Sequence, residues 1–488
     1  MNWILCQARA AGVKVLGGLT ATFFGLLVAL PQAAATLSAV FLGATILLVA
    51  SRIFCALRSQ PVPLERRDSC EDFVSIHIAT YSEPPEVVCR TLDSLARLNY
   101  DNYEVIVLDN NTPEAALYEP VREHCRTLGE RFRFYHFDGV RGAKAGALNI
   151  SLRLADPATE YILILDADYQ AEPDILSSGL AYFSHSDVGL VQFPQAYRNS
   201  SDSCGLSWEY RLFFDVYMNL ANSHNTVLST GTAAFVNRSA LEKSGGWSGD
   251  TLTEDAELGL RLHRYGYRGV YVPQVAAAGV MPTDLESLRV QRRRWVLGNA
   301  QSLSALWKEA DLPWGRKAMM VLQLTAWASP LSLPTVAMLV AGLFYEFSGD
   351  PLALQVFAMS CASVATYLLG MMMFFLVATA RHGGSLAAGY SAYLAHLGLL
   401  WEASICPWEL FVSSDKSFER TCKFLKAPRL AAFTLSLLLG VVGVATGFNL
   451  MVGGGSLTLA AGCLVLSTGV LGQAFLRWNL HQIRNRTS

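Results

Sequence analysis

The chain has 488 residues, of which 52% are hydrophobic and only 16% are charged, a mixture too apolar for an ordinary soluble protein. Its formal net charge of −2 gives no overall basic surface, which argues against a nucleic-acid partner. The ten cysteines are scattered and form neither a C-x-x-C pair nor a metal-ligating set with histidine, so we interpret them as reduced packing residues.

Six apolar runs are long enough to cross a bilayer, because about 20 helical residues span its hydrocarbon core. The short loops after the first, third and fifth runs contain no Lys or Arg, whereas basic residues gather at the opposite ends of the runs. By the positive-inside rule, both termini and the region between the second and third runs face the cytoplasm. The sequence therefore predicts a multi-pass membrane protein. The six runs lie near residues 12–30, 36–57, 319–346, 353–380, 429–450 and 456–477.

Two segments have a second interpretation. Residues 1–35 could form a cleaved signal peptide, because basic residues precede an apolar stretch that ends in Gln32-Ala-Ala-Ala35. Residues 386–411 are apolar but include His396, Glu402 and Glu409, and a membrane crossing there would invert the charge pattern. We therefore expect residues 386–411 to lie at the membrane interface.

Residues 58–318 have the composition of a soluble domain and alternate between strand and helix patterns. Such alternation predicts a mostly parallel sheet with helices on both faces. Ligands of these sheets bind beyond the carboxyl ends of the strands, so polar residues there are the first functional candidates. The expected strands are 74–79, 103–108, 132–136, 161–165, 188–193, 233–236 and 270–272, and the expected helices include 85–98 and 143–154.

Two of these strands end in acidic residues. Asp109 follows the second strand, and Asp166-Ala-Asp168 follows the fourth. A single Asp at a strand end is equally well explained as a turn residue or helix cap, so Asp109 alone stays ambiguous. Carboxylates at positions i and i+2 can converge on a hard cation that also bridges a diphosphate. We favour this role for Asp166 and Asp168, because two like charges at one buried strand end need a counter-ion.

A further acidic residue opens an expected helix within residues 251–262. Thr253 is a candidate cap, and Leu258 and Leu262 fall on the face expected to be buried. Asp255 is then in the first turn. Acidic residues are common there because they match the helix dipole, and this segment alone does not separate that explanation from catalysis.

The sequence Gln291-Arg-Arg-Arg-Trp295 lies in a helical stretch just before the third apolar run. Gln291, Arg294 and Trp295 share one helix face, while Arg292 and Arg293 point elsewhere. A guanidinium can clamp phosphate oxygens, and an indole offers a flat apolar surface for a sugar ring. A basic helix anchored to anionic lipid explains the same residues equally well.

These four motifs, in this order and between membrane runs, resemble the signature of processive family 2 glycosyltransferases. That family includes cellulose, chitin, hyaluronan and bacterial β-(1,3)-glucan synthases. The resemblance covers residues 73–425, and residues 108–114, 144–149 and 254–261 are most similar to the bacterial β-(1,3)-glucan synthases. Asn110 departs from the pattern, because the family often has a second Asp at that position.

The resemblance implies an α/β domain of the GT-A (Rossmann-like) type in the cytosol, inserted between transmembrane helices of a bacterial inner membrane. The expected parts are two N-terminal transmembrane helices in residues 1–57, the catalytic domain with an interfacial helix in 58–318, and a C-terminal transmembrane region in 319–488. A cytosolic gating loop is expected at 413–428, where Phe418, Thr421 and Lys423 resemble the loop that closes over the nucleotide in cellulose synthases. A basic juxtamembrane loop is the simpler alternative.

The resemblance also implies a role for each matched residue. Asp255 matches the general base, which takes a proton from the acceptor hydroxyl as it attacks the anomeric carbon; this inverts an α-linked donor to a β-linked product. Asp168, with Asp166, would bind Mg²⁺ or Mn²⁺. The residues expected to bind the UDP-sugar are Thr80, Tyr81, Glu83, Asp109, Lys144, Asp166 and Arg294. The residues expected at the acceptor site are Gly231, Thr232, Glu254, Gln291 and Trp295.

We therefore expect a processive inverting glycosyltransferase that builds a β-glucan, with β-(1,3) linkage favoured, from UDP-glucose and passes it across the membrane. Its partners would be the UDP-sugar, the growing polysaccharide and membrane lipid. Two alternatives stay open: transfer of one sugar to a lipid or polyprenyl phosphate, and a β-polysaccharide synthase of cellulose, mannan or chitin type. A non-enzymatic transporter or receptor would leave the acids at two strand ends unexplained.

Overall fold

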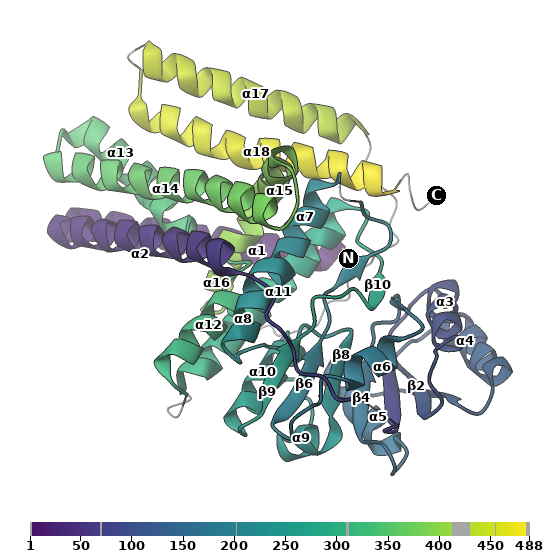
Figure 1. Ribbon diagram of the computed structural model, residues 1–488. Coiled ribbons are helices and arrows are strands. Elements are labelled where there is room, and N and C mark those ends of the chain that lie inside the picture. Colours follow the sequence, from purple (N-terminus) through teal and green to yellow (C-terminus); the bar gives the residue numbers. More distant parts are fainter. Residues whose placement is uncertain are drawn as a thin grey trace.

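A computed structural model describes residues 2–68, 71–201, 203–308, 312–411, 430–453 and 455–484 (Figure 1). Two long helices, α1 (Asn2–Ala29) and α2 (Pro31–Arg58), precede an α/β domain, and mostly long apolar helices follow it. The long helices lie together on one side of the molecule and the α/β domain lies on the other (Figure 1). The chain therefore has the order that the composition predicts, with one domain inserted between groups of apolar helices.

The described residues form a seven-stranded sheet in the order β3-β2-β1-β4-β8-β6-β9. Strand β8 is antiparallel to both of its neighbours, and the other pairs are parallel. The sheet is therefore mixed, and each of the expected strands is present to within two residues at either end. The strands are β1 (Val74–Thr80), β2 (Tyr103–Asn110), β3 (Phe132–Phe137), β4 (Tyr161–Ile164), β6 (Val188–Gln192), β8 (Ala234–Asn237) and β9 (Arg268–Tyr271).

The sheet is buried on both faces, which explains why its strands read as continuous apolar runs. Along β4, Leu163 packs into one hydrophobic cluster, while Ile162 and Ile164 pack into another. Side chains of a strand alternate between its faces, so one short strand contributes to both cores. The helices of this domain are α3 (Pro85–Leu95), α4 (Ala115–Leu128), α5 (Ala143–Leu154), α6 (Ile175–Leu180), α9 (Arg238–Lys243) and α10 (Glu254–Arg264).

A second, three-stranded sheet was not expected from the sequence. It has the order β5-β10-β7, formed by β5 (Gln170–Ala171), β10 (Ala277–Gly279) and β7 (Ala196–Tyr197). Strands of two or three residues are too short to show any hydrophobic periodicity, so pattern reading cannot detect them.

A layer of mostly short helices, together with the 24-residue α11, connects the α/β domain to the long apolar helices. Helices α15 and α16 have 13 and 10 residues, so neither reaches the length needed to cross a bilayer. The position expected for residues 386–411 at the membrane interface stays a prediction. The layer comprises α7 (Gly205–Leu212), the π-helix η1 (Phe213–Met218), α8 (Asn219–Ser223), α11 (Leu285–Lys308), α12 (Trp314–Leu324), α15 (Leu386–Gly398) and α16 (Leu400–Glu409).

Among the described residues, five helices are long and apolar enough to cross a membrane. A sixth apolar helix, α13 (Ser332–Ser348), has only 17 residues and packs against α1 and α14. Five of the six expected runs thus correspond to a helix of spanning length. These five helices are α1, α2, α14 (Pro351–Arg381), α17 (Leu430–Val452) and α18 (Leu457–Arg484).

The third expected run is broken into α12 and α13. Pro330 lies in the break and disfavours helix at the residue before it. Arg52 of α2, only 1% exposed, donates hydrogen bonds from Nη2 to the carbonyl oxygens of Thr325 (2.9 Å) and Ala328 (2.8 Å). A buried arginine thus binds carbonyl groups that a continuous helix would have satisfied internally.

Candidate active site

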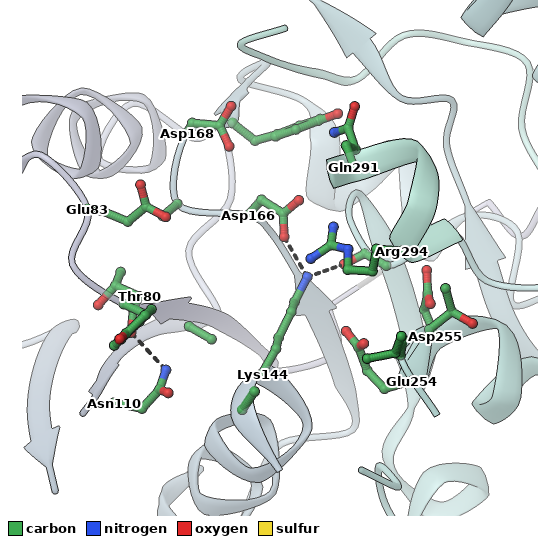
Figure 2. Close-up of a pocket in the computed structure, with 18 of the residues that line it drawn as sticks. Thr80, Glu83, Asn110, Lys144, Asp166, Asp168, Glu254, Asp255, Gln291 and Arg294 are labelled. Atoms are coloured by element: carbon green, nitrogen blue, oxygen red, sulfur yellow. Dashed lines mark hydrogen bonds and ion pairs between the residues drawn. The ribbon is translucent and has the colours of Figure 1, made fainter. Parts of the chain in front are cut away.

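A cavity of about 350 Å³ lies beyond the carboxyl ends of β1, β2 and β4, and α11 forms its opposite side (Figure 2). Its residues come from eight separate stretches of the chain, which the sheet and α11 bring together. The polar and aromatic residues that line it include Thr80, Tyr81, Glu83, Asn110, Asn111, Lys144, Asp166, Asp168, Gln195, Thr230, Thr253, Glu254, Asp255, Gln291, Arg294 and Trp295.

Lys144 is the central cation of this cavity. Its Nζ donates hydrogen bonds to Asp166 Oδ1 (2.5 Å) and to the carbonyl oxygen of Gly231 (2.7 Å) (Figure 2). Burial acts to lower the pKa of Lys144, but the carboxylates of Asp166 and Glu254 outweigh that effect and raise it. The side chain is therefore a stable ammonium that connects the end of β4 to the loop before β8.

Asp166 and Asp168 line the same cavity, directly after β4. The backbone N–H of Val280 donates to Asp168 Oδ2 at 2.6 Å, so the end of the small sheet orients that carboxylate. The described residues contain no group of three or more His, Cys, Asp or Glu side chains that could hold a metal. Mg²⁺ in nucleotide-dependent enzymes is commonly bound by one or two carboxylates, with phosphate oxygens and water completing its shell. The two carboxylates fit a cation of that kind.

Asp109 does not line the cavity, so the structure places it one residue away from the wall, and its expected contact with the nucleotide stays a prediction. Its side chain is 3% exposed, and its carboxylate forms hydrogen bonds with His136 Nδ1 (2.8 Å) and with the hydroxyls of Thr80 (2.9 Å) and Thr112 (2.7 Å). Successive side chains of a strand point to opposite sides, so the next residue, Asn110, reaches the cavity instead. Asp109 therefore lies behind the wall and supports Thr80.

Thr232 also lies behind the wall rather than in it. It is 1% exposed, and its hydroxyl accepts a hydrogen bond from the backbone N–H of Asp166 at 3.0 Å. Thr253 precedes α10 as expected, but its side chain forms no capping hydrogen bond, and its buried hydroxyl has no partner within the described residues. Thr253 instead lines the cavity.

Asp255 lies in the first turn of α10, next to Gly231 in the cavity wall. Gly231 has φ +86°, and a Cβ atom placed on it would lie 2.7 Å from Asp255 Oδ2. Only glycine therefore suits this position, both for its backbone conformation and for the space it leaves. Burial, together with the adjacent charge of Glu254, raises the pKa of Asp255 to about 7. A carboxylate with such a pKa can accept a proton near neutral pH.

Helix α11 lines the opposite side with the face that its spacing predicts. Gln291, Arg294 and Trp295 all reach the cavity. Arg292 and Arg293 point away, and each pairs with a glutamate of another helix. The arginines of this short motif therefore divide between the cavity and the protein interior.

A smaller cavity of about 60 Å³ adjoins the first one at Asp255, Thr253, Thr230 and Trp295. Most residues that line it were not expected from the sequence, and Asn299 and Trp327 are two of them. Asn299 follows Trp295 by one helical turn, so extending the cavity face of α11 would have found it. Trp327 lies in the break between α12 and α13, which no sequence pattern indicated.

The expected gating loop at 413–428, with Phe418, Thr421 and Lys423, lies outside the described residues. The structure therefore places none of these three side chains. The other expected site residues lie either in the wall of the larger cavity or, for Asp109 and Thr232, directly behind it.

Two protein-family models match the chain. Residues 161–427, more than half of its length, match the model for glycosyl transferase family group 2. Residues 75–245 match the model for glycosyl transferase family 2. Together the two matched ranges contain every expected site residue.

Curated relatives of the chain include enzymes with different acceptors. A cellulose synthase catalytic subunit of Pseudomonas fluorescens is 28% identical over 328 residues, which is 64% of this chain and 42% of that one. A probable glucomannan 4-beta-mannosyltransferase of Oryza sativa is 30% identical over 285 residues (54% and 48%). A beta-monoglucosyldiacylglycerol synthase of Nostoc is 30% identical over 248 residues (48% and 50%). The matched region covers no more than half of each relative.

Among solved structures, the mannosyltransferase PcManGT from Pyrobaculum calidifontis, in complex with GDP-Man and Mn²⁺, superimposes with a TM-score of 0.52. The two sequences are 22% identical, and the match covers 75% of this chain and 99% of that one. At this identity the likeness shows a shared fold.

Proposed function

The chain belongs to glycosyl transferase family group 2, and we propose that it is a processive inverting synthase that polymerises a β-linked glucan from UDP-glucose. It is a membrane-associated glycosyltransferase whose catalytic domain has the GT-A fold. The observation that carries the proposal is the convergence on one cavity of an acidic pair, a buried carboxylate with a raised pKa, and an Arg-Trp helix face. We favour β-(1,3) linkage because of the resemblance of residues 108–114, 144–149 and 254–261 to β-(1,3)-glucan synthases.

On the donor side, Thr80, Tyr81 and Glu83 would surround the nucleoside, and Asp109 would support Thr80 from behind. Asp166 and Asp168 would hold Mg²⁺ or Mn²⁺, which when bound supplies positive charge to the diphosphate. Lys144 would then bind the diphosphate oxygens, since its ammonium already lies against Asp166.

On the acceptor side, Asp255 would take the proton of the attacking hydroxyl, and Arg294 would stabilise the negative charge of the departing diphosphate. Trp295 and Gln291 would hold the acceptor sugar by stacking and by hydrogen bonding, with Glu254, Gly231 and the supporting Thr232 completing the site. A single in-line displacement gives a product of inverted configuration, which supports a β-linked product from an α-linked donor.

For the whole chain, we propose the arrangement expected from its charge pattern. Residues 1–57 and 319–488 would hold the membrane helices, and the catalytic domain in 58–318 would face the cytoplasm of a bacterial cell. The nascent polysaccharide would then cross the membrane through these helices, and the loop at 413–428 would close over the nucleotide.

A second candidate function is transfer of a single sugar to a membrane lipid. The beta-monoglucosyldiacylglycerol synthase is 30% identical to this chain, about the same as the cellulose synthase and glucomannan relatives. Sequence similarity therefore supports the two candidate functions equally. The cavity next to Trp295 is compatible with either acceptor, so the product has to decide between the two functions.

The test is to supply purified protein in lipid nanodiscs with UDP-glucose and Mg²⁺ and to measure product length and linkage. We expect a water-insoluble β-(1,3)-glucan, with UDP-mannose and UDP-N-acetylglucosamine as matched donor controls. A lipid-extractable monosaccharide as the sole product would reject processivity and support the second candidate. Absence of transfer from every sugar nucleotide tested would reject the proposed function.

A further inference from the structure

Three arginines of α11 form ion pairs away from the cavity. Each pairs with a buried glutamate of a helix distant in sequence, so α11 is held by charge pairs on the sides that face away from the ligand. The pairs are Arg289 with Glu402 of α16, Arg292 with Glu209 of α7, and Arg293 with Glu409 of α16.

The Arg292–Glu209 pair differs from the other two in burial and geometry. Its side chains are 0% and 1% exposed, whereas the arginines of the other pairs are 21% and 24% exposed. Two parallel hydrogen bonds join the groups, from Nη1 to Oε1 (2.8 Å) and from Nη2 to Oε2 (2.7 Å). The guanidinium also lies 4.1 Å from the ring centroid of Trp327, a residue of the smaller cavity.

The residues next to this pair connect it to the larger cavity. Tyr210, adjacent to Glu209, donates a hydrogen bond to Gln291 Oε1 at 2.6 Å. The same ring packs edge-on against Trp295, with centroids 5.4 Å apart. Glu209 thus holds Arg292, and the adjacent Tyr210 contacts two side chains of the cavity wall, Gln291 and Trp295.

The pair also connects α11 to the helices of the membrane region. His396 Nδ1 of α15 lies 3.5 Å from Glu209 Oε1, and the other ring nitrogen of His396 is 3.2 Å from the hydroxyl of Tyr367 in α14. Burial acts to raise the pKa of Glu209, but Arg292 outweighs this effect and lowers the pKa to about 2. The carboxylate therefore stays ionised within a layer of buried side chains.

We propose that Glu209 and Arg292 form a positioning pair that fixes the rotation of α11 about its axis and thereby directs Gln291, Arg294 and Trp295 into the cavity. This inference rests on the proposed function. A helix turns by about 100° per residue, so a small rotation of α11 moves all three side chains together. Buried ion pairs add little net stability over apolar residues of similar size, whereas their two-bond geometry defines one orientation.

The test compares Glu209→Gln with Glu409→Gln, which alters another buried partner of α11. We expect Glu209→Gln to lower kcat for transfer by about 10- to 100-fold, because small displacements of positioning groups have effects of that size. The Kd for UDP should change much less than kcat, since the strand ends would hold most of the nucleotide and, of the displaced side chains, only Arg294 would contact its diphosphate. Glu409→Gln should change neither quantity by more than about twofold. Equal losses in the two variants would overturn the proposal.

A double variant separates positioning from simple stabilisation. Glu209→Gln with Arg292→Met removes both charges, and we expect it to regain the Tm that Glu209→Gln loses, because no uncompensated buried charge remains. Its kcat should stay low, and amide hydrogen exchange around residue 291 should stay faster than in wild type. Recovery of kcat together with Tm would make the pair merely structural. If the wild-type protein transfers no sugar, the proposed function fails, and hydrogen exchange alone then decides the inference.

Discussion

The two sides of the larger cavity hold their charges in different ways. At the strand ends, the pair of Lys144 and Asp166 lies inside the cavity, where a ligand can replace either partner. On α11, the pair of Arg292 and Glu209 lies behind the cavity and is fully buried. The strand-end side can therefore rearrange when a nucleotide binds, whereas the α11 side is held in place before binding. We expect donor binding to depend on the first side and transfer to depend on the second, with Asp255 between them.

Asp255→Asn should have the largest effect, because Asp255 lies between the two sides of the cavity and would be the general base. We expect transfer to fall by about 1,000-fold or more through loss of the base, with the Kd for UDP nearly unchanged. The raised pKa means that the folded protein binds more protons than the unfolded chain, so ionisation of Asp255 lowers stability as pH rises towards 7. Asn carries no charge, so Tm at pH 8 should not fall. Substantial residual turnover would refute the base assignment.

Asp168→Ala should break the donor side selectively. Removing one of the two carboxylates should weaken UDP binding by about 10-fold or more in the presence of Mg²⁺ and have little effect in its absence. Isothermal titration calorimetry with and without the cation measures this difference. Asp187→Ala is a matched control, because it removes a carboxylate that pairs with Arg268 and does not line the cavity. Identical UDP affinity of wild type and Asp168→Ala under both conditions would reject the metal role.

Gly231→Ala should give a smaller loss. The added methyl group would lie 2.7 Å from Asp255 Oδ2, and alanine is strained at φ +86°. We expect kcat to fall by about 10-fold and Tm to drop by a few degrees, both through displacement of Asp255 or of the 231 loop. Gly245 also has positive φ (+89°) but lies outside the cavity, so Gly245→Ala controls for backbone strain alone. Equal kcat in the two variants would show that the contact with Asp255 is unimportant.

The smallest expected effect is a shift in the pH dependence of the transfer rate. If transfer requires ionised Asp255, its rate should rise with pH through about 7 and be lost below that value. Burial is the main cause of the raised pKa of Asp255, and the charge of Glu254 is the second. Glu254→Gln should therefore shift the rise in rate to lower pH without abolishing the pH dependence. The measurement is kcat/KM between pH 5 and 9. If the rise of kcat/KM occurs at the same pH in Glu254→Gln as in wild type, a group other than Asp255 controls the pH dependence.

The strand-end side could be predicted from sequence because its information is local. Asp166 and Asp168 follow an apolar strand directly, and the parallel arrangement brings such ends to one edge of the sheet. Whether Asp109 or Asn110 lines the cavity is also a local question, since the answer requires knowing which face of β2 points to the cavity. Alternation alone leaves that choice open.

The α11 side could be predicted only in part. Helical spacing correctly separated Gln291, Arg294 and Trp295 from Arg292, but it could not identify the partner of Arg292, which lies 83 residues away. Likewise, Trp327 lines the smaller cavity because it lies in a helix break, and Arg52, which stabilises that break, is distant in sequence. Long-range pairs of this kind depend on tertiary packing, which single-sequence periodicity does not contain.

The hydrogen bonds of Arg52 also bear on how the protein can be produced. Because Arg52 of α2 binds the carbonyl oxygens of Thr325 and Ala328, α2 provides hydrogen bonds to a turn that lies much later in the chain. A shortened protein that starts after residue 58 would leave these carbonyls without that partner, next to Trp327 and the smaller cavity. We therefore expect the shortened protein to lose transfer activity, and co-expression of residues 1–58 as a separate peptide to restore it at least in part.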